Sequence, residues 1–347
     1  MKRIYLDHNA TAPLRPEARA AMVAAMDVIG NPSSVHAEGR AARALIERAR
    51  AQVAAALGAE GADVIFTSGA TEAAALACAG RGLVGAGIEH DAVRAWIAED
   101  LDVDANGQVR VPDPARSTLQ LANSETGIIQ TLPEGLAVSD MTQGFGKLPV
   151  AFNWSGVQMA LVSAHKLGGP KGIGALVVRR GTDVTARIRG GGQEMGRRAG
   201  TENVIGIAGF GAAAEAAARD LAVGSWARVE KIRNILESAI AQISNETIFV
   251  GKDSPRLPNT SCFLTPGWKG ETQVMALDLA GFAVSAGSAC SSGKVQASRV
   301  LQAMGYDVPA ASSALRVSLG LEVTEEDALR FADSWARLWQ RHQARLA

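Results

Sequence analysis

The stretch QMALVSAHKLGGPKGIGALVVRR, residues 158–180, contains two apolar runs that are separated by a lysine and a cluster of glycines. The runs at 158–164 and 174–180 are short and apolar, so they predict two buried strands. His165 and Lys166 directly follow the first run, and ligands of an open α/β sheet collect beyond the carboxyl ends of its strands. The glycines between the runs favour backbone that approaches a ligand or another chain, although a loop alone could account for them.

Short strands alternate with helices through most of the chain. The segments 16–30 and 41–58 have apolar residues at helical spacing and end on glycine, which often follows the last turn of a helix. Further short apolar runs at 63–67, 117–122 and 135–139 predict more buried strands. This alternation favours a mostly parallel sheet that is covered by helices on both faces.

The pattern changes from about residue 246, where shorter β-branched runs become frequent. Helical patterns between these runs lie at 270–280, 295–304 and 324–345. The last of these helices begins with TEED, a capping-box sequence. We therefore expect a large α/β domain over residues 12–245 and a smaller α+β domain formed by 1–11 and 246–347.

The composition excludes several classes of protein. The 347 residues include 35 basic and 35 acidic side chains, so no strong field attracts polyanions, and we expect no direct nucleic-acid ligand. No apolar run is long enough to span a bilayer, and the first residues do not form a secretory signal. The three cysteines are too widely spaced for a disulfide framework or a metal site. We expect a cytoplasmic protein in a reducing environment, with no metal and no membrane partner.

Polar residues follow four of the predicted strands. The run at 63–67 leads into Ser68-Gly69-Ala70-Thr71, whose backbone N–H groups could open a helix and bind a phosphate. Asn123, Asp140 and the pair His165-Lys166 follow three other strands. Each feature alone is more often an ordinary helix start, a cap or a solvated side chain. A phosphate cup, a carboxylate, an amide and a lysine at one edge of a sheet are together the set that holds pyridoxal 5'-phosphate.

Longer motifs identify the chain as similar to a known family. They include YLDHNATAP (5–13), GNPSSVHAEGRAAR (30–43), IFTSGATE (65–72), IEHDAV (88–93), ANSETGIIQ (122–130), SAHKLGGPKGIGAL (163–176), GGGQEMGRRAGTENV (190–204), SAGSACSSG (285–293) and ALRVSLG (314–320). The chain resembles the cysteine desulfurases of the class V aminotransferase family, which are pyridoxal-phosphate enzymes of fold type I. The resemblance implies a large domain with a mainly parallel, seven-stranded-type sheet covered by helices, and a smaller α+β C-terminal domain.

The resemblance also assigns roles around the cofactor ring. It implies that Lys166 is the Schiff-base lysine and that Asp140 is the partner of the ring nitrogen. Gln143 would hydrogen-bond the phenolic oxygen, and His90 would stack on the ring and could relay protons. Asn123 would be a further cofactor contact. His90 could otherwise be a histidine of the core or surface.

Further residues are expected to bind the phosphate and the substrate. The resemblance implies that the phosphate is held by Ala70, Thr71, Ser163 and His165. In the family's homodimer a threonine reaches the phosphate site of the partner subunit, and here that residue is Thr201. Arg316 would bind the substrate carboxylate as a bidentate fork, and Asn31 would lie near the substrate. Without the resemblance, Arg316 could pair with an acidic neighbour.

Cys290 lies among small residues that cannot cover its thiol. The resemblance implies that Cys290 attacks the sulfur of L-cysteine, which leaves a persulfide on the enzyme and releases L-alanine. An unperturbed thiol has a pKa of about 8.5, so a cationic neighbour or a proton relay must favour the thiolate. A tight turn with an incidental thiol is the other interpretation. Cys78 and Cys262 lie in apolar patterns and are better explained as small core residues.

The resemblance implies sulfur transfer to an acceptor protein, either an iron–sulfur scaffold or an enzyme of tRNA thiolation. A selenocysteine lyase or another pyridoxal-phosphate C–S lyase is an alternative, because the same cofactor chemistry serves each. A non-catalytic member of the family is a second alternative, since three stretches between motifs are shorter than the family pattern. Ser124 also stands where the family usually has an asparagine that touches the cofactor.

Overall fold

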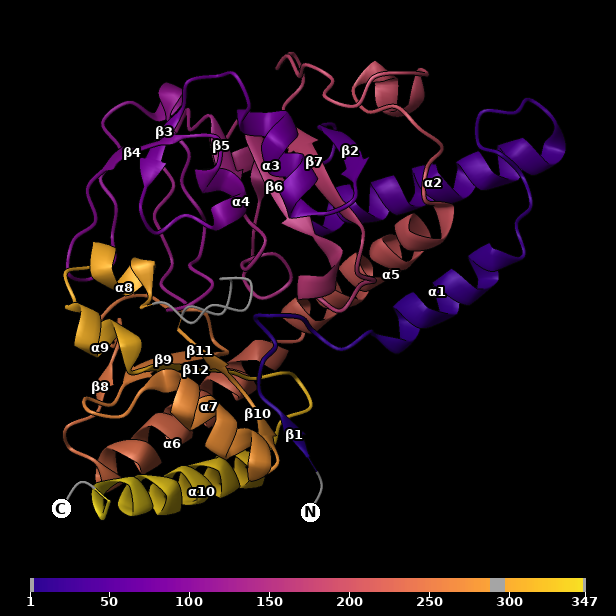
Figure 1. Cartoon of the computed structure of the whole chain (residues 1–347). Helices are drawn as coiled ribbons and strands as arrows, with labels where there is room; N and C mark the ends of the chain where they lie inside the picture. The colour runs from indigo at the N-terminus through magenta and orange to yellow at the C-terminus, as the bar shows by residue number, and fades with distance from the viewer. Residues whose placement is uncertain (1–2, 288–296, 346–347) are drawn as a thin grey trace.

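The computed structural model describes residues 3–287 and 297–345, which form two lobes (Figure 1). The described helices are α1 (Pro16–Met26), α2 (Ala37–Ala56), α3 (Ala70–Cys78), α4 (Asp91–Arg94), α5 (Val204–Ala222), α6 (Ser225–Ile243), α7 (Gly270–Leu279), α8 (Arg299–Ala303), α9 (Val308–Ser312) and α10 (Glu325–Gln343). The described strands are β1 (Ile4–Tyr5), β2 (Asp63–Thr67), β3 (Val84–Ala86), β4 (Ala98–Leu101), β5 (Val138–Asp140), β6 (Met159–Ser163), β7 (Gly174–Val178), β8 (Ile248–Phe249), β9 (Thr260–Leu264), β10 (Phe282–Ala283), β11 (Ser285–Ala286) and β12 (Ala314–Ser318).

The sheet of the first lobe has the order β2-β7-β6-β5. Strands β5 and β6 are parallel, whereas β7 is antiparallel to both β6 and β2. Parallel bridges from Thr118 to β5 and from Ser117 to β3 extend the sheet, and β3 pairs in parallel with β4. If residues 117–118 are counted as a strand, the described sheet has seven strands, of which β7 alone runs against the others. The predicted mainly parallel sheet is therefore confirmed.

The predicted strand at 117–122 pairs with β5 as far as Leu121, whose N–H donates to the carbonyl oxygen of Asp140. Its first two residues bridge to neighbouring strands, but Ala122 pairs with Ile129 in an antiparallel bridge instead. The chain therefore leaves the sheet before Asn123 and turns back on itself. This turn places Asn123 and Ser124 at the edge of the sheet rather than at the end of a regular strand.

Both faces of the sheet are buried, as the apolar runs predict. Because successive side chains of a strand point to opposite faces, Phe66 and Val162 lie in one core cluster with residues of α2 and α5. Ile65 and Leu161 lie in a second cluster with the apolar residues of α3. The helices on the two faces hold the strands so that the carboxyl ends of β2, β3, β5 and β6 share one edge.

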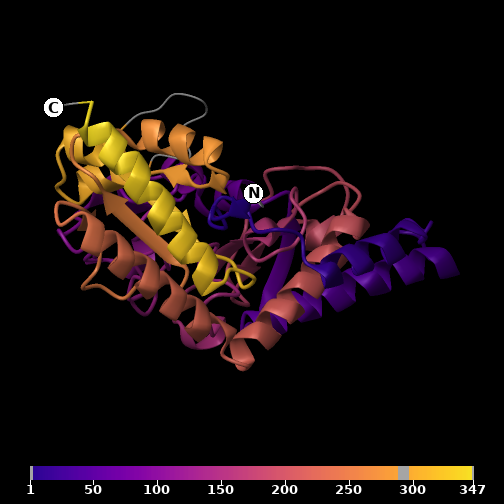
Figure 2. The ribbon, with the colours of Figure 1, turned by 90° about the horizontal axis from the view of Figure 1, so that it is seen from below.

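Helices α1 and α2 form a hairpin that packs along α5 and projects away from the second lobe (Figure 2). Helix α2 ends at Ala56 and is followed by Gly58 at φ +62°, as the glycine predicts. The prediction that the first helix runs to Gly30 is wrong, because α1 ends at Met26. A Cβ atom at Gly30 would lie 1.9 Å from the carbonyl oxygen of Glu38, so this glycine permits close packing of the loop on α2.

The second lobe contains a sheet with the order β11-β12-β9-β8, in which all pairings are antiparallel. One face, which includes Phe263 and Leu315, packs against α6 and α10. Helix α10 begins with the predicted capping box, formed by Thr324 and Asp327. The N-terminal strand β1 pairs with β10, so the first residues join this lobe as expected. Helix α8 begins at Arg299, later than the predicted start at 295.

The core of the second lobe includes residues that precede residue 245. Val229, Leu236 and Ile240 of α6 lie in the core cluster of the second lobe. That core therefore takes in the chain from about Ser225, where α6 begins. The division into a large domain over 12–245 and a smaller domain over 1–11 and 246–347 stays a prediction. Helix α6, however, packs in the core of the second lobe.

Two classes of feature are absent from the described residues. Over 3–287 and 297–345, no helix combines the length and the apolar character that a membrane span requires. No group of three or more histidine, cysteine, aspartate or glutamate side chains in the same ranges is arranged to hold a metal ion. Cys78 and Cys262 are buried free thiols, as predicted for small core residues.

Candidate active site

A cavity of about 550 Å³ opens at the edge of the sheet where β2, β5 and β6 end. Eight of the predicted site residues line it: Ala70, Thr71, His90, Asp140, Gln143, Ser163, His165 and Lys166. They come from four separate segments of the chain. Their convergence follows from the topology, because strands that run in the same direction present their final residues at one edge.

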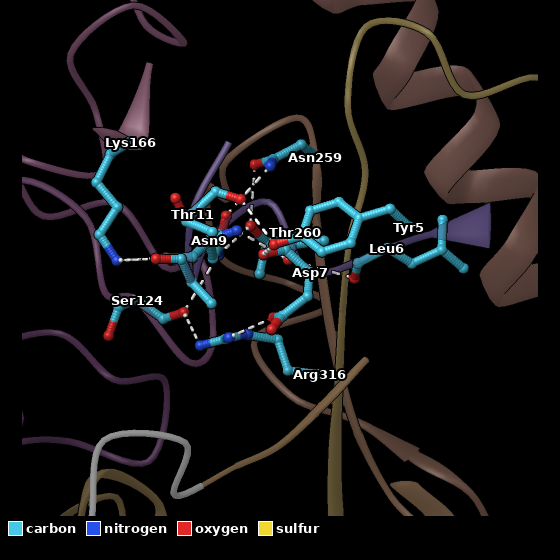
Figure 3. Close-up of polar contacts among 12 residues, drawn as sticks. Tyr5, Leu6, Asp7, Asn9, Thr11, Ser124, Lys166, Asn259, Thr260 and Arg316 are labelled. Atoms are coloured by element: carbon cyan, nitrogen blue, oxygen red, sulfur yellow. Dashed lines mark hydrogen bonds and ion pairs between the residues drawn. The ribbon is translucent and has the colours of Figure 1, made fainter. Parts of the chain in front are cut away.

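Lys166 lies on the short 3₁₀ turn Ala164–Lys166 that directly follows β6. Its ammonium group donates hydrogen bonds to the carbonyl oxygens of Asn9 (2.6 Å) and Ala10 (2.9 Å) (Figure 3). The N-terminal segment therefore holds the lysine at the wall of the cavity.

Asp140 is the last residue of β5, and its side chain is buried at the wall of the cavity. Its Oδ1 accepts a hydrogen bond from the backbone N–H of Thr142 at 2.9 Å. Burial raises the pKa of the neighbouring Glu89 to about 8. The negative charge of Asp140 also raises this pKa, whereas the hydrogen bond from the backbone N–H of Gln120 lowers it. Among the described residues that line the cavity, Asp140 alone carries a carboxyl group, which suits a protonated ring nitrogen.

The start of α3, at the wall of the same cavity, is suited to an anion. Gly69 is the N-cap of α3, so the first N–H groups of that nine-residue helix lack intrahelical acceptors. Gly174 makes this turn possible, since a Cβ atom there would lie 2.8 Å from the backbone of Gly69. Lys166 and Lys171 both line the cavity and add positive charge.

Histidine 165 lies beside these lysines and is neutral at pH 7. Burial, together with the charges of Lys166, Lys171 and Lys147, lowers its pKa to about 4. Its Nδ1 atom is buried and has no hydrogen-bond partner among the described residues. A neutral imidazole with an unused nitrogen can bind a phosphate oxygen or a ring without adding charge.

The donors and acceptors of the cavity fit pyridoxal 5'-phosphate. Two hydroxyls, Thr11 Oγ1 and Thr142 Oγ1, are buried at its wall and find no partner within the described part of the chain. Buried polar atoms are normally paired, so these orphans indicate a polar ligand. A lysine, one carboxylate and a helix N-terminus in the same cavity match an aldehyde, a ring nitrogen and a phosphate group.

His90 caps α4, and its Nδ1 accepts a hydrogen bond from Ala92 N at 3.1 Å. When Nδ1 accepts, the proton of a neutral ring lies on Nε2. His90 is half-buried and lines the cavity, which is consistent with the predicted contact to the ring. The cap fixes the direction of the imidazole before any ligand binds.

Gln143 also lines the cavity, and two hydrogen bonds fix its amide group. Nε2 donates to the carbonyl oxygen of Asn9 at 2.9 Å, and Oε1 accepts from Lys147 Nζ at 2.8 Å. Asn9 also contacts the second lobe, because its Nδ2 donates to Thr260 Oγ1 at 2.9 Å. Figure 3 shows Asn9 between Lys166 and the residues of β9 and β12.

Arg316 lies in the middle of β12 and is 2 % exposed. Its Nη2 donates to Asp7 Oδ1 at 2.7 Å, and its Nη1 donates to the carbonyl oxygen of Ser124 at 3.1 Å (Figure 3). The guanidinium does not line the 550 Å³ cavity, whereas Ser124 does. Arg316 Nε is buried and lacks a partner among the described residues, so one donor is left for a ligand.

Besides Arg316, four predicted residues lie outside the cavity or outside the described chain. Asn123 is buried, and its side chain bonds Ile88 O, Glu125 N and Thr126 N, so Ser124 lines the cavity in its place. Asn31 lies in the exposed loop between α1 and α2, and its Oδ1 accepts from Ser33 N. Thr201 lines a separate cavity of about 200 Å³ that shares Ser68 and Gly172 with the main one. Cys290 lies outside the described residues.

Sequence reasoning missed four residues that shape this site: Asp7, Asn9, Glu89 and Lys147. Three of them belong to the motifs YLDHNATAP and IEHDAV, in which only His90 received a role. Lys147 stands four residues after Gln143, a spacing that could have suggested a contact. Their partners lie far away in the sequence, so no local pattern identified the contacts.

Comparison with known proteins identifies the family of the chain. A sequence model of the family described as "Aminotransferase class-V" matches residues 4–96 and 100–331. A cysteine desulfurase of Cereibacter sphaeroides is 39% identical and aligns over 92% of this chain and 91% of its own. The cysteine desulfurase IscS of Dictyoglomus turgidum is 37% identical over 94% of this chain and 92% of its own. The structure of a NifS-like protein from Rickettsia africae superposes with a TM-score of 0.88 at 30% identity, covering 97% of this chain and 99% of that one.

The chain therefore belongs to the aminotransferase class-V family. Within that family its relatives are cysteine desulfurases, and both the family and these relatives are pyridoxal-phosphate enzymes. This likeness supports a cysteine desulfurase activity for the chain and agrees with the lysine, carboxylate and anion cup of the cavity.

Proposed function

We propose that the protein is a pyridoxal-phosphate-dependent cysteine desulfurase that converts L-cysteine into L-alanine and receives the sulfur on Cys290. One observation carries the proposal: Lys166, Asp140 and the N-terminus of α3 face one cavity of about 550 Å³. The family and the named relatives support the same chemistry.

The residues of the cavity would hold the cofactor at three points. Lys166 would bind its aldehyde carbon, and Asp140 would keep the ring nitrogen protonated. The first turn of α3, with Ser163 and His165, would hold the phosphate. When bound, the cofactor supplies an electron sink that lets the Cα proton of an amino acid leave. Lys166 Nζ would take this proton as an amine, and His90 Nε2 could exchange protons on the same side of the cavity.

Arg316 would bind the carboxylate of the substrate. Its position on β12 is fixed by Asp7 and by the carbonyl oxygen of Ser124, which leaves the unpartnered Nε for a further bond. A planar guanidinium can bind a carboxylate through two parallel N–H groups. A small movement of Ser124, which separates Arg316 from the cavity, would admit the carboxylate.

The proposed sulfur transfer needs no external oxidant. The thiolate of Cys290 attacks the substrate sulfur, an S–S bond forms, and the substrate C–S bond breaks. The electron pair of that bond stays with the carbon skeleton, which takes up a proton and leaves as alanine. The enzyme retains a persulfide at Cys290, which would pass to an acceptor protein for iron–sulfur cluster assembly or tRNA thiolation. A homodimer in which Thr201 reaches the partner's phosphate site is part of the proposal.

The test mixes the purified protein with pyridoxal 5'-phosphate, L-cysteine and a reductant, and measures alanine and sulfide together. Equal amounts of both products support desulfuration, whereas pyruvate and ammonia would indicate β-elimination. Lys166→Ala is expected to lose the visible absorption of the lysine-bound cofactor. If the wild type itself lacked this absorption, the protein would be a non-catalytic member of the family without cofactor.

A second variant separates the desulfurase from a selenocysteine lyase or another C–S lyase. Cys290→Ala is expected to keep the visible absorption but to lose sulfide release. Undiminished sulfide release from Cys290→Ala would overturn the persulfide mechanism, because simple elimination needs no enzyme thiol.

A further inference from the structure

Lys147 is a second lysine at the candidate site, and it is only 4% exposed. Its ammonium group donates to Gln143 Oε1 at 2.8 Å and approaches Asn9 Oδ1 at 3.4 Å. Both acceptors are neutral side-chain amides. A buried cation without a carboxylate partner costs free energy, so its retention here calls for an explanation other than stability.

The contacts of Gln143 supply that explanation. An ammonium group can only donate, and a backbone carbonyl oxygen can only accept. Lys147 therefore requires the amide oxygen of Gln143 on its side, and Asn9 O requires the amide nitrogen on the other. The two partners together allow one orientation of the amide, in which the second hydrogen of Nε2 remains for a ligand of the cavity that Gln143 lines.

The charge on Lys147 is sensitive to its surroundings. Burial lowers its pKa to about 7, and the positive charges of Lys166 and Arg316 lower it in the same direction. Lys147 and Lys166 also line a smaller cavity of about 230 Å³, whose other charged or titratable side chains are His8, Arg15 and Glu322. Arg15 is paired with Asp220 and His8 with Glu322, and no carboxylate of the described residues forms an ion pair with Lys147.

We propose that Lys147 is a positioning residue for the cofactor: it acts through Gln143, and it makes the Gln143 amide present an N–H group, rather than its carbonyl oxygen, to the cofactor's phenolic oxygen. This inference rests on the proposed function, because it assumes that pyridoxal 5'-phosphate occupies the cavity. It assigns no contact between Lys147 and the cofactor itself.

The experiment is a double-mutant cycle on cofactor binding. The Kd for pyridoxal 5'-phosphate and the visible absorption maximum are measured for the wild type, Lys147→Met, Gln143→Leu and the double variant. Lys147→Met is expected to raise the Kd about tenfold and to move the absorption maximum, because an amide held by Asn9 O alone is fixed less firmly in the orientation that presents the N–H group. The double variant is expected to bind no more weakly than Gln143→Leu alone, since Lys147 acts through that residue.

Two further variants control the result. Lys231→Met removes an exposed lysine of α6 and should leave the Kd and the spectrum unchanged. Lys147→Arg keeps a group that can only donate and should recover most of the affinity. Lys147→Leu replaces Lys147→Met in the cycle if thermal unfolding of the cofactor-free protein shows that the methionine variant does not fold.

The outcomes distinguish the two proposals. A wild-type protein that binds no pyridoxal 5'-phosphate would overturn the proposed function. A wild type that binds it while Lys147→Met binds equally well would overturn the role of Lys147 alone. Additive losses in the double variant would also overturn that role, because they would mean that Lys147 does not act through Gln143.

Discussion

Asp7 and Arg316 lie 309 positions apart in the sequence, and their side chains form an ion pair of 2.7 Å beside the candidate active site. The pair joins the segment after β1 to the centre of β12 (Figure 3). It neutralises a buried guanidinium and fixes its plane before a substrate arrives. Charge-assisted hydrogen bonds of this kind are stronger than neutral ones, so the pair can set the direction of Arg316.

Asp7→Asn is expected to raise the KM for L-cysteine about tenfold and to change kcat less, because Arg316 loses the partner that holds its fork in place. Steady-state sulfide release measures both constants. Asp278→Asn is the matched control, since Asp278 pairs with Arg3 on the surface with both side chains more than half exposed. An unchanged KM in Asp7→Asn would show that Arg316 does not depend on Asp7 for substrate binding.

Ser124→Asn is expected to tighten the binding of pyridoxal 5'-phosphate by about fivefold. Ser124 lines the cavity, and an asparagine there would add one amide that can reach the cofactor. One neutral hydrogen bond contributes about 1 kcal/mol, which corresponds to this factor. Equilibrium titration of the visible absorption measures the Kd. Weaker binding in the variant would indicate that the larger side chain disturbs the carbonyl of residue 124, which accepts from Arg316.

Glu125→Gln is expected to change how stability depends on pH. Burial raises the pKa of Glu125 from 4.5 to about 7, although the hydrogen bond from Ser298 (2.5 Å) and the charge of Arg316 oppose the rise. A raised folded-state pKa means that the folded protein binds more protons than the unfolded chain between pH 4.5 and about 7. The contribution of Glu125 to stability is therefore full below pH 4.5 and is lost as the pH rises through about 7.

Thermal unfolding of the cofactor-free wild type and of Glu125→Gln across this range tests the sign. Relative to the wild type, the variant should gain stability as the pH rises from 4.5 to about 7 and then stay level. A difference that is constant with pH would mean that Glu125 titrates alike in the folded and unfolded protein.

Glu237→Gln is expected to destabilise the second lobe by about 3–5 kcal/mol, because it leaves the buried Arg256 without its counter-charge. The two carboxylate oxygens of Glu237 accept from Arg256 at 2.8 and 3.0 Å, and the side chains are 11% and 5% exposed. Urea unfolding measures the change. Glu230→Gln on the same helix is the control: its pair with Arg233 has an exposed carboxylate and should be worth less than about 1 kcal/mol. Equal effects from the two variants would contradict the importance of burial.

Local patterns predicted the strand ends well for a physical reason. A buried strand must be apolar and short, and the first polar residue after it must stand at the edge of the sheet. Asp140, His165 and Lys166 were located on this basis, and all three line one cavity. The end of α1 was misplaced because Gly30 serves packing against α2, and close packing leaves no mark in the pattern of a single helix.

The sequence by itself determined the alternation of strands and helices, the resemblance to a family and the polar groups that follow the strands. It did so because periodicity, turns and strand ends depend on neighbouring residues. The tertiary structure alone decided that Asp7 pairs with Arg316, that Asn9 holds Lys166, and that Lys147 is buried against Gln143. These contacts arise where the N-terminal segment lies between the two lobes, and burial there comes from residues that are distant in the chain.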